Sequence, residues 1–145
     1  DTVAALRALW TDEEASHEGT HVRFEPVWSF PKPVQDPHPP ILFGGAGPLA
    51  TEHTIAWADG WMPMDVSLGD VERALTRFRR RAAAAGRDIP VTLVTFGDPE
   101  PDTLRRYRDL GVARTVIGAA RTAWDDPSTT LAYVDRYAPL VDELA

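Results

Sequence analysis

The sequence predicts an α/β fold with a parallel β-sheet, and three observations indicate it. Short apolar segments alternate with helical patterns four times in succession between residues 39 and 145. The first of these segments, Ile41-Leu42-Phe43, has no polar alternation, which is typical of a strand buried on both faces. Each strand-helix unit takes roughly 20 to 30 residues, and successive units of that length join parallel strands by right-handed crossovers.

Residues 1–38 are expected to form a helix and a proline-rich connector. Apolar side chains recur at helical spacing over residues 2–10, which predicts a short amphipathic helix. Further along, Val22 and Phe24 lie on one side of a strand-like pattern.

The connector is defined by the six prolines between residues 26 and 40. Proline fits neither a regular helix nor a central strand, so this segment is expected to be extended. Trp28 and Phe30 are expected to hold the connector against the body by burying aromatic area. A linker between domains is the alternative, but the two aromatic residues and Val34 favour a packed loop.

Residues 39–145 carry the four strand-helix units. The strands are expected at residues 41–43, 58–64 (with its preceding turn), 89–96 and 112–117, and the helices at residues 48–58, 71–85, 99–110 and 127–144. Each helix has apolar positions that predict its buried face, namely Leu49, Ile55 and Ala56; Val71, Leu75, Phe78 and Ala82; Leu104, Tyr107 and Leu110; and Leu131, Val134, Ala138 and Val141.

A glycine-rich turn follows the first of these strands. Gly44, Gly45 and Gly47 allow a tight turn and a close approach of a ligand to the backbone, and Pro48 suits the first position of the next helix. Free N–H groups at a helix N-terminus suit a phosphate. The residues alone leave two interpretations open, a phosphate site and a purely structural turn.

Composition excludes several classes of function. The chain has 145 residues and a net charge of −7, which argues against nucleic-acid binding. The arginines between residues 77 and 81 are interpreted as a solvated helix face. Without cysteine there is neither a disulfide nor a thiol nucleophile, and a cytoplasmic location is expected. No apolar stretch has the length of a membrane span. The chain also lacks an initiator methionine, as a fragment would.

No metal site and no nucleophilic constellation is predicted. His17 and His21 flank a glycine, so they do not share a helix face, and no histidine pair has an acidic partner at zinc-site spacing. The pattern Gly-x-Ser-x-Gly is absent, and Ser67 is interpreted as a helix cap.

Two architectures fit the four units, a small doubly wound sheet and half of an eight-stranded β/α barrel. Both place ligands beyond the C-terminal ends of the strands. Those ends lie at residues 44–47, 62–65, 95–98 and 118–121.

Several motifs together resemble a known family. They are Phe24-Glu25-Pro26, Pro31-Lys32-Pro33-Val34-Gln35, Pro37-His38-Pro39-Pro40-Ile41-Leu42-Phe43-Gly44-Gly45 and Ala58-Asp59-Gly60-Trp61. The combination resembles the C-terminal half of the luciferase-like monooxygenase family, in the branch that uses the deazaflavin coenzyme F420. The resemblance covers essentially the whole chain and implies the C-terminal half, strands five to eight, of a (β/α)8 barrel, as one partial domain over residues 1–145.

The resemblance also implies roles for individual residues. Asp59 is expected to cap or turn the chain, and Trp61 to pack. The backbone of residues 44–47 is expected to bind the phosphate of coenzyme F420 or, alternatively, FMN, through Gly44, Gly45, Ala46 and Gly47. The residues expected to line a cofactor or substrate pocket are Met62, Met64, Asp65 and Arg121.

The implied function is that of part of a flavin- or deazaflavin-dependent oxidoreductase acting on a small organic substrate. In the resembled family most residues near the reacting carbon come from the first four strands, so no catalytic residue is assigned here. The alternative is a truncated, non-catalytic homologue that serves as a structural module. A half barrel would expose strand edges and an apolar inner face, so self-association into a homo-oligomer is expected.

Overall fold

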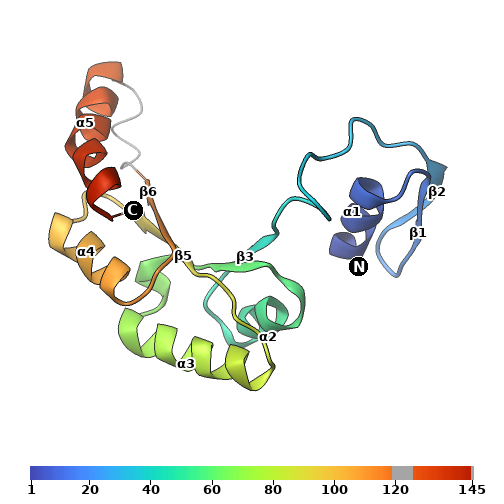
Figure 1. The fold of residues 1–145 in the computed structure, drawn as a ribbon, viewed down its shortest axis with the longest axis horizontal. Helices are drawn as coiled ribbons and strands as arrows, with labels where there is room; N and C mark the ends of the chain where they lie inside the picture. The colour runs from blue at the N-terminus through green and yellow to red at the C-terminus, as the bar shows by residue number, and fades with distance from the viewer. Residues whose placement is uncertain (119–125, 145) are drawn as a thin grey trace. The chain divides into compact units, whose positions relative to one another are not determined.

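The structure is a computed structural model that describes residues 1–118 and 126–144 (Figure 1). The chain divides into two compact units, Asp1–Pro40 and Ile41–Ala145. Among the described residues, no helix is long and apolar enough to cross a membrane.

The first unit consists of a helix, a hairpin and the connector. Helix α1 (Thr2–Thr11) packs against an antiparallel pair of strands, β1 (Ala15–Glu18) and β2 (Arg23–Val27). The helix and the strand that contains Phe24 confirm the prediction. The sequence does not reveal β1, because its residues Ala-Ser-His-Glu carry no apolar alternation.

Asp1 fastens the hairpin to the start of α1. One carboxylate oxygen accepts the N–H groups of His21 and Val22 at 2.6 and 2.8 Å, and the other lies 2.7 Å from His17 Nε2. His17 therefore has an acidic partner that is distant in the sequence, and this contact is part of the fold of the unit.

Within the first unit, the connector is held by a lysine. Trp28 is 78% exposed and Phe30 64% exposed, so neither ring is buried against the helix or the hairpin of this unit, and their packing onto the strand-helix units stays a prediction. Lys32 Nζ instead donates to the carbonyl oxygens of Leu9 and Asp12 at 2.8 and 2.5 Å, at the end of α1. The last carbonyls of a helix lack intrahelical partners and suit a lysine ammonium.

The second unit contains the four strand-helix units in the predicted order. Its elements are β3 (Leu42–Gly44), α2 (Pro48–Trp57), β4 (Gly60–Met62), the short 3-10 helix η1 (Asp65–Ser67), α3 (Val71–Ala84), β5 (Thr92–Phe96), α4 (Pro101–Asp109), β6 (Arg114–Gly118) and α5 (Pro127–Leu144).

The strands run parallel in the spatial order β3, β4, β5, β6. Strands β3 and β4 pair with Phe43 opposite Trp61, and β5 and β6 pair with Val94 opposite Val116. Parallel bridges between Trp61 and Val91 and between Met64 and Val94 join the two pairs. All four C-terminal ends therefore lie at one edge of the sheet, as predicted.

The two faces of this sheet differ. One face is covered by helices and forms the core, which includes Leu75 and Phe78 of α3, Leu104 of α4 and Leu93 of β5. Residues paired across strands share a face, so Met64, Val94 and Val116 lie together on the other face. On that side Met64, Phe96 and Val116 are exposed.

The helix ends follow local sequence signals. The Asp70 side chain accepts the backbone N–H of Arg73 and caps α3, in the predicted cap segment. Gly86 and Gly111 follow α3 and α4 with φ of +70° and +74°, which a glycine adopts without strain. Ser67 lies in η1 and donates to the Met64 carbonyl, so it does not cap α3 as interpreted from the sequence.

The buried faces of α3 and α4 are as predicted, that of α2 is so only in part, and that of α5 is not. In α2, Ile55 packs against the core as predicted, but Leu49 and Ala56 are exposed, and the fully buried positions are Thr51 and Thr54. Their hydroxyls donate to the carbonyls of Gly47 and Ala50, so burial leaves no polar group unpaired.

In α5 the predicted apolar positions also face outward. Leu131, Val134 and Val141 are between 56% and 67% exposed, and Ala138 is exposed as well. The helix instead buries Tyr137 and Leu140.

Candidate functional site

The glycine turn connects the end of β3 to the start of α2. Gly45 has a φ of +94°, and a side chain there would meet the Ala50 methyl group at 3.0 Å. Gly47 is the N-cap residue of α2, and Pro48 is its first residue, as predicted. A Cβ on Gly47 would meet nothing within 4 Å, so the backbone is open to approach there.

The tripeptide Asp59-Gly60-Trp61 fixes both ends of β3. The Asp59 carboxylate accepts the N–H of Ile41 at 2.8 Å, just before the strand. Trp61 Nε1 donates to the carbonyl oxygen of Gly45 at 2.8 Å, just after it. Gly60 lies between them, and a Cβ there would displace the Leu42 side chain, since it would lie 2.5 Å from a methyl carbon of that residue.

Trp61 is itself held by the core. Its ring stacks on Phe78 of α3 with a centroid distance of 4.2 Å and an interplanar angle of 28°. Trp61 is buried, so it packs as expected from the sequence, and its N–H also fixes the glycine turn. The shape of the turn thus depends on α3 through one indole ring.

The N-terminus of α2 has the properties of an anion site. No side chain of the described residues caps this helix. Its first N–H groups have no intrahelical acceptor, and the helix dipole places positive potential there. These groups open onto the glycine turn.

Cationic side chains lie beside this turn. A cavity of about 40 Å³ is lined by Ala46, Thr51 and Ser67, and also by Arg77 and Arg81 of α3. Arg81 is 3.8 Å from Glu52 of α2, which offsets part of its charge. The sequence pattern predicts only a solvated helix face for Arg77 and Arg81. Their spacing of four residues nevertheless places them on one side of α3.

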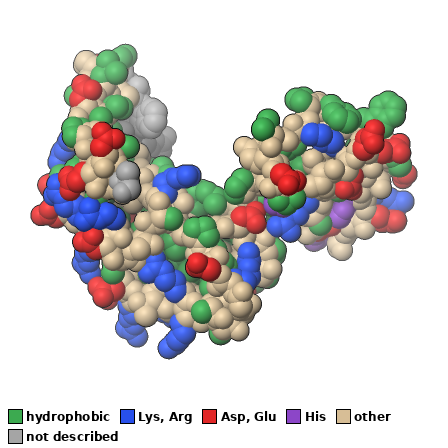
Figure 2. All heavy atoms as spheres, in the orientation of Figure 1, with side chains coloured by type: hydrophobic (Ala, Val, Ile, Leu, Met, Phe, Trp, Pro, Cys, Tyr) green, Lys and Arg blue, Asp and Glu red, His purple; other side chains and the backbone are tan. Residues whose placement is uncertain are grey.

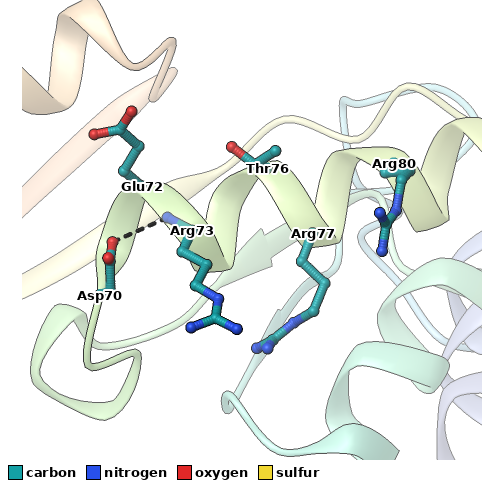
Figure 3. Close-up of a pocket in the computed structure, with 6 residues that line it drawn as sticks. All are labelled: Asp70, Glu72, Arg73, Thr76, Arg77 and Arg80. Atoms are coloured by element: carbon teal, nitrogen blue, oxygen red, sulfur yellow. Dashed lines mark hydrogen bonds between the residues drawn. The ribbon is translucent and has the colours of Figure 1, made fainter.

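Arginines of α3 also border solvent, on the outer surface of the molecule. A wide hollow on the outer surface is lined by residues of α3 and its cap. Figure 3 shows them together with the hydrogen bond that the Arg73 N–H donates to the Asp70 carboxylate. These residues are Asp70, Glu72, Arg73, Thr76, Arg77 and Arg80. A single helix supplies them, so the hollow matches the predicted solvated face and lacks converging walls.

The three predicted pocket residues at the end of β4 and beyond it have different environments. Met62 is half-buried and pairs with Gly44, which brings it next to the glycine turn. Met64 is exposed on the face of the sheet away from the helices.

Asp65 begins η1 and is already engaged. Its carboxylate accepts the N–H of Val66 at 2.7 Å and the hydroxyl of Tyr107 at 3.0 Å. Burial, with the hydrogen bond to Asp65, raises the pKa of Tyr107 to about 12, so the phenol stays protonated and donating. The predicted Arg121 lies outside the described residues.

A polar cluster closes the end of β5. The hydroxyl of Tyr133 donates to the Gly97 carbonyl at 2.7 Å, and that of Tyr137 donates to the Asp98 carboxylate at 2.6 Å. Burial and then the hydrogen bond to Asp98 raise the pKa of Tyr137. Arg136 pairs with the same carboxylate. The cluster fixes α5 to the loop after β5.

Comparisons with known proteins agree with the sequence motifs. A family model described as luciferase-like monooxygenase matches residues 1–110. Uncharacterised proteins of Mycobacterium bovis and Mycobacterium tuberculosis are 43% identical over 141 residues, which is 92% of this chain and 46% of each relative. An FMNH(2)-dependent dimethylsulfone monooxygenase of Pseudomonas putida is 29% identical over 94 residues, 65% of this chain and 26% of that protein. The chain thus spans about half the length of the first relatives.

A solved structure shares the fold. An F420-dependent secondary alcohol dehydrogenase in complex with an F420-acetone adduct superimposes with a TM-score of 0.58 at 15% identity, covering 81% of this chain and 54% of that one. The four parallel strands and their helices form part of a (β/α)8 barrel, which decides between the two architectures that the sequence left open.

Proposed function

Because this chain belongs to the luciferase-like monooxygenase family, we propose that it supplies the cofactor-phosphate corner of a flavin- or deazaflavin-dependent oxidoreductase. One observation carries the proposal. The glycine turn at Gly44, Gly45, Ala46 and Gly47, fixed by the bond from Trp61 to Gly45, leads into an uncapped helix N-terminus beside Arg77.

These residues fit a phosphate group. The backbone at Gly47 is open, so a phosphate oxygen has room to reach the first N–H groups of α2. The guanidinium of Arg77 lines the neighbouring cavity and adds a charged donor. The hydroxyl of Thr51 is already bonded to the Gly47 carbonyl, so it stabilises the turn and offers the phosphate no free proton.

We propose coenzyme F420 as the cofactor, with FMN as the alternative. When bound, either cofactor supplies the redox chemistry, namely hydride exchange with a small organic substrate or, for reduced flavin, activation of oxygen. The chain itself binds and orients the phosphate end. Met62 at the end of β4 and Met64 just beyond it are proposed to line the pocket, with Asp65 at its border and Arg121 beyond β6.

The proposal is tested by titration with coenzyme F420 and with FMN, followed by fluorescence. The titration compares this chain with a completed barrel. That barrel combines this chain with the part of the Mycobacterium tuberculosis relative that lies outside the aligned 141 residues.

Arg77→Gln is expected to weaken cofactor binding about tenfold, because one charged donor is lost. Arg80→Gln is the matched control, since Arg80 lies on the same helix but lines only the outer hollow. Equal affinities for both variants, or no binding by either protein, would contradict the proposal.

A self-associating structural module is the second candidate. The exposed apolar side chains on the inner face of the sheet favour it, since such a surface promotes pairing with another copy. Sedimentation of the chain over a range of concentrations tests this homo-oligomer, and a monomer throughout would exclude it.

A further inference from the structure

The last paired residues of β5 and β6 place an aromatic ring against a glycine. Phe96 pairs with Gly118 at the C-terminal ends of these two strands. A Cβ on Gly118 would lie 2.6 and 2.7 Å from two carbons of the Phe96 ring, so the ring lies across the Gly118 backbone. A side chain at position 118 would therefore push the ring away from β6.

Phe96 belongs to the face of the sheet that the helices leave open. Side chains alternate along a strand, so Phe96 shares its face with Val94, which bridges to Met64 and pairs with Val116. Phe96 is 58% exposed, and Figure 2 shows hydrophobic side chains at the surface over the strands of this unit. From Val94 onward, the described residues of β5 and β6 on this face carry no charged group and no hydroxyl.

The strand end that carries Phe96 is fixed from two sides. The Gly97 N–H donates to the Gly118 carbonyl at 3.0 Å, which fixes it to β6. The Gly97 carbonyl accepts the hydroxyl of Tyr133 at 2.7 Å, which fixes it to α5. Gly97 has a φ of +94°, so the chain leaves the strand directly after Phe96. The backbone that carries the ring is thus held in place before a ligand binds, which lowers the entropy cost of binding.

Phe96 lies at the same edge of the sheet as the glycine turn that ends β3. Strands β3, β4 and β5 are neighbours, and neighbouring strands lie about 4.8 Å apart, so β5 is about 10 Å from β3. In a (β/α)8 barrel the C-terminal edge is the mouth that binds ligands, whereas inward side chains further down fill the interior. Phe96 therefore lines the mouth, and Val94 and Val116 lie in the layer beneath it.

We propose that Phe96 is a specificity-determining residue that contacts the hydrocarbon part of an uncharged substrate, and that Gly118 sets the depth available to that part. The ring offers apolar area and no hydrogen bond, so a charged substrate group would lose its hydration there without compensation. The inference rests on the proposed function, because it assigns the substrate class of the same site.

The substrate is a better occupant of this face than the ring system of the cofactor. The tricyclic ring of a flavin or deazaflavin has carbonyl and N–H groups along one edge, and such groups need polar partners when they are buried. Phe96, Val94 and Val116 provide none. A hydrocarbon chain needs no such partner and gains free energy from the apolar contact alone.

The test uses the completed barrel and two kinds of probe, with binding measured by ligand-observed NMR in the presence and in the absence of coenzyme F420. Unbranched methyl ketones, from butanone to octanone, are neutral and differ only in chain length. Levulinate is a methyl ketone that carries a carboxylate. Each added methylene should strengthen ketone binding by up to about fourfold, because it buries one CH2 group. Levulinate should bind more weakly than pentanone.

Variants of the two paired residues separate the presence of the ring from its position. Phe96→Ala should weaken octanone binding by at least about tenfold, because the longer chain loses its contact with the ring. Gly118→Ala keeps the ring but displaces it, so it should weaken octanone binding and leave butanone binding nearly unchanged. Leu131→Ala is the matched control, since it also truncates an exposed apolar side chain, but on α5.

Three results would overturn the inference. They are no binding of any ketone, equal ketone affinities for Phe96→Ala and Leu131→Ala, and binding of levulinate as tight as that of pentanone. A loss of coenzyme F420 affinity in Phe96→Ala with an unchanged ketone series would also overturn it, because Phe96 would then contact the cofactor. Ketone binding that depends on Phe96 in a barrel that binds neither F420 nor FMN would support the apolar contact and contradict the proposed function, so the two failures are distinguishable.

Discussion

Helices α3 and α5 differ in what covers their apolar side chains. In α3, Leu75 and Phe78 lie in the core, and the opposite side is charged. In α5, the core receives Tyr137 and Leu140, while the aliphatic side chains of Leu131, Val134 and Val141 are exposed. Apolar residues at helical spacing therefore indicate a helix face that packs against another surface. They do not indicate whether that surface belongs to the same segment of chain.

The two helices are also attached differently. Helix α3 is attached by close packing, since Phe78 stacks on Trp61. Helix α5 buries Tyr137 and Leu140 in the core and is also held by polar contacts, which include the hydroxyls of Tyr133 and Tyr137 and the ion pair between Arg105 and Glu143. This ion pair lowers the pKa of Glu143, but the pair is exposed and adds little stability.

The largest predicted effect contrasts one residue from each helix. Phe78→Ala should lower the free energy of unfolding by about 3–5 kcal/mol, because it leaves a cavity beneath Trp61. Val134→Ala should change it by no more than about 0.5 kcal/mol in the isolated chain, because Val134 is exposed. Urea unfolding of both variants measures the difference. Comparable losses of stability would mean that the Val134 side chain is already covered in the isolated chain.

A smaller effect is expected in the glycine turn. Gly45→Ala should lower the free energy of unfolding by about 1–2 kcal/mol, because a residue with a side chain is strained at the φ of +94° found there. Gly47→Ala is the matched control, with a φ of −70° and open space around it, and should cost less than about 1 kcal/mol. Thermal unfolding compares the two. Equal losses would show that the turn does not depend on the conformation of Gly45.

Local signals made most of the fold predictable. The four units follow from apolar runs and helical spacing, and helix ends follow from residues such as Asp70, Gly86 and Gly111, whose effects act within a few positions. The buried threonines of α2 were not predictable from hydrophobicity, because Thr51 and Thr54 become suitable core residues only through bonds to the helix backbone.

The site was predictable only in part. The sequence singled out the turn at Gly45 because glycine is locally informative. It did not indicate the bond from Trp61 to Gly45 or the position of Arg77 beside Ala46, since both depend on how distant segments pack. The face taken by α5 was missed for the same reason, because a pattern of apolar residues does not say which of two faces meets the core.

The helix caps offer a finer comparison. Asp70 accepts the N–H of Arg73 at 3.0 Å in α3, and Asp126 accepts the N–H of Ser128 at 2.9 Å at the start of α5. Asp70→Ala should lower the free energy of unfolding, measured with urea, by about 1 kcal/mol, because α3 belongs to the core. Asp126→Ala should lower this free energy by less, if α5 is the less firmly packed helix. The reverse order would contradict that difference.

A pH effect should be the smallest of these changes. Burial raises the pKa of Tyr107 to about 12 from an ordinary value of 10.0, so the neutral phenol is favoured in the folded state. Its contribution is complete below pH 10.0 and is lost as the pH rises from there through about 12. Tyr107→Phe should therefore flatten the fall in stability above pH 10.0, as measured by urea unfolding at several pH values. An unchanged pH profile would contradict this contribution.

The most direct test of the proposed cofactor-phosphate corner is an NMR titration of the amide signals of Gly44, Gly45, Ala46 and Gly47 with coenzyme F420 and with FMN, in the completed barrel and in this chain. We predict that these four amides shift together and saturably, because the phosphate approaches the N-terminus of α2. Shifts confined to the outer hollow around Arg73 and Arg80, or no shift in the glycine turn while a cofactor binds elsewhere, would contradict the account.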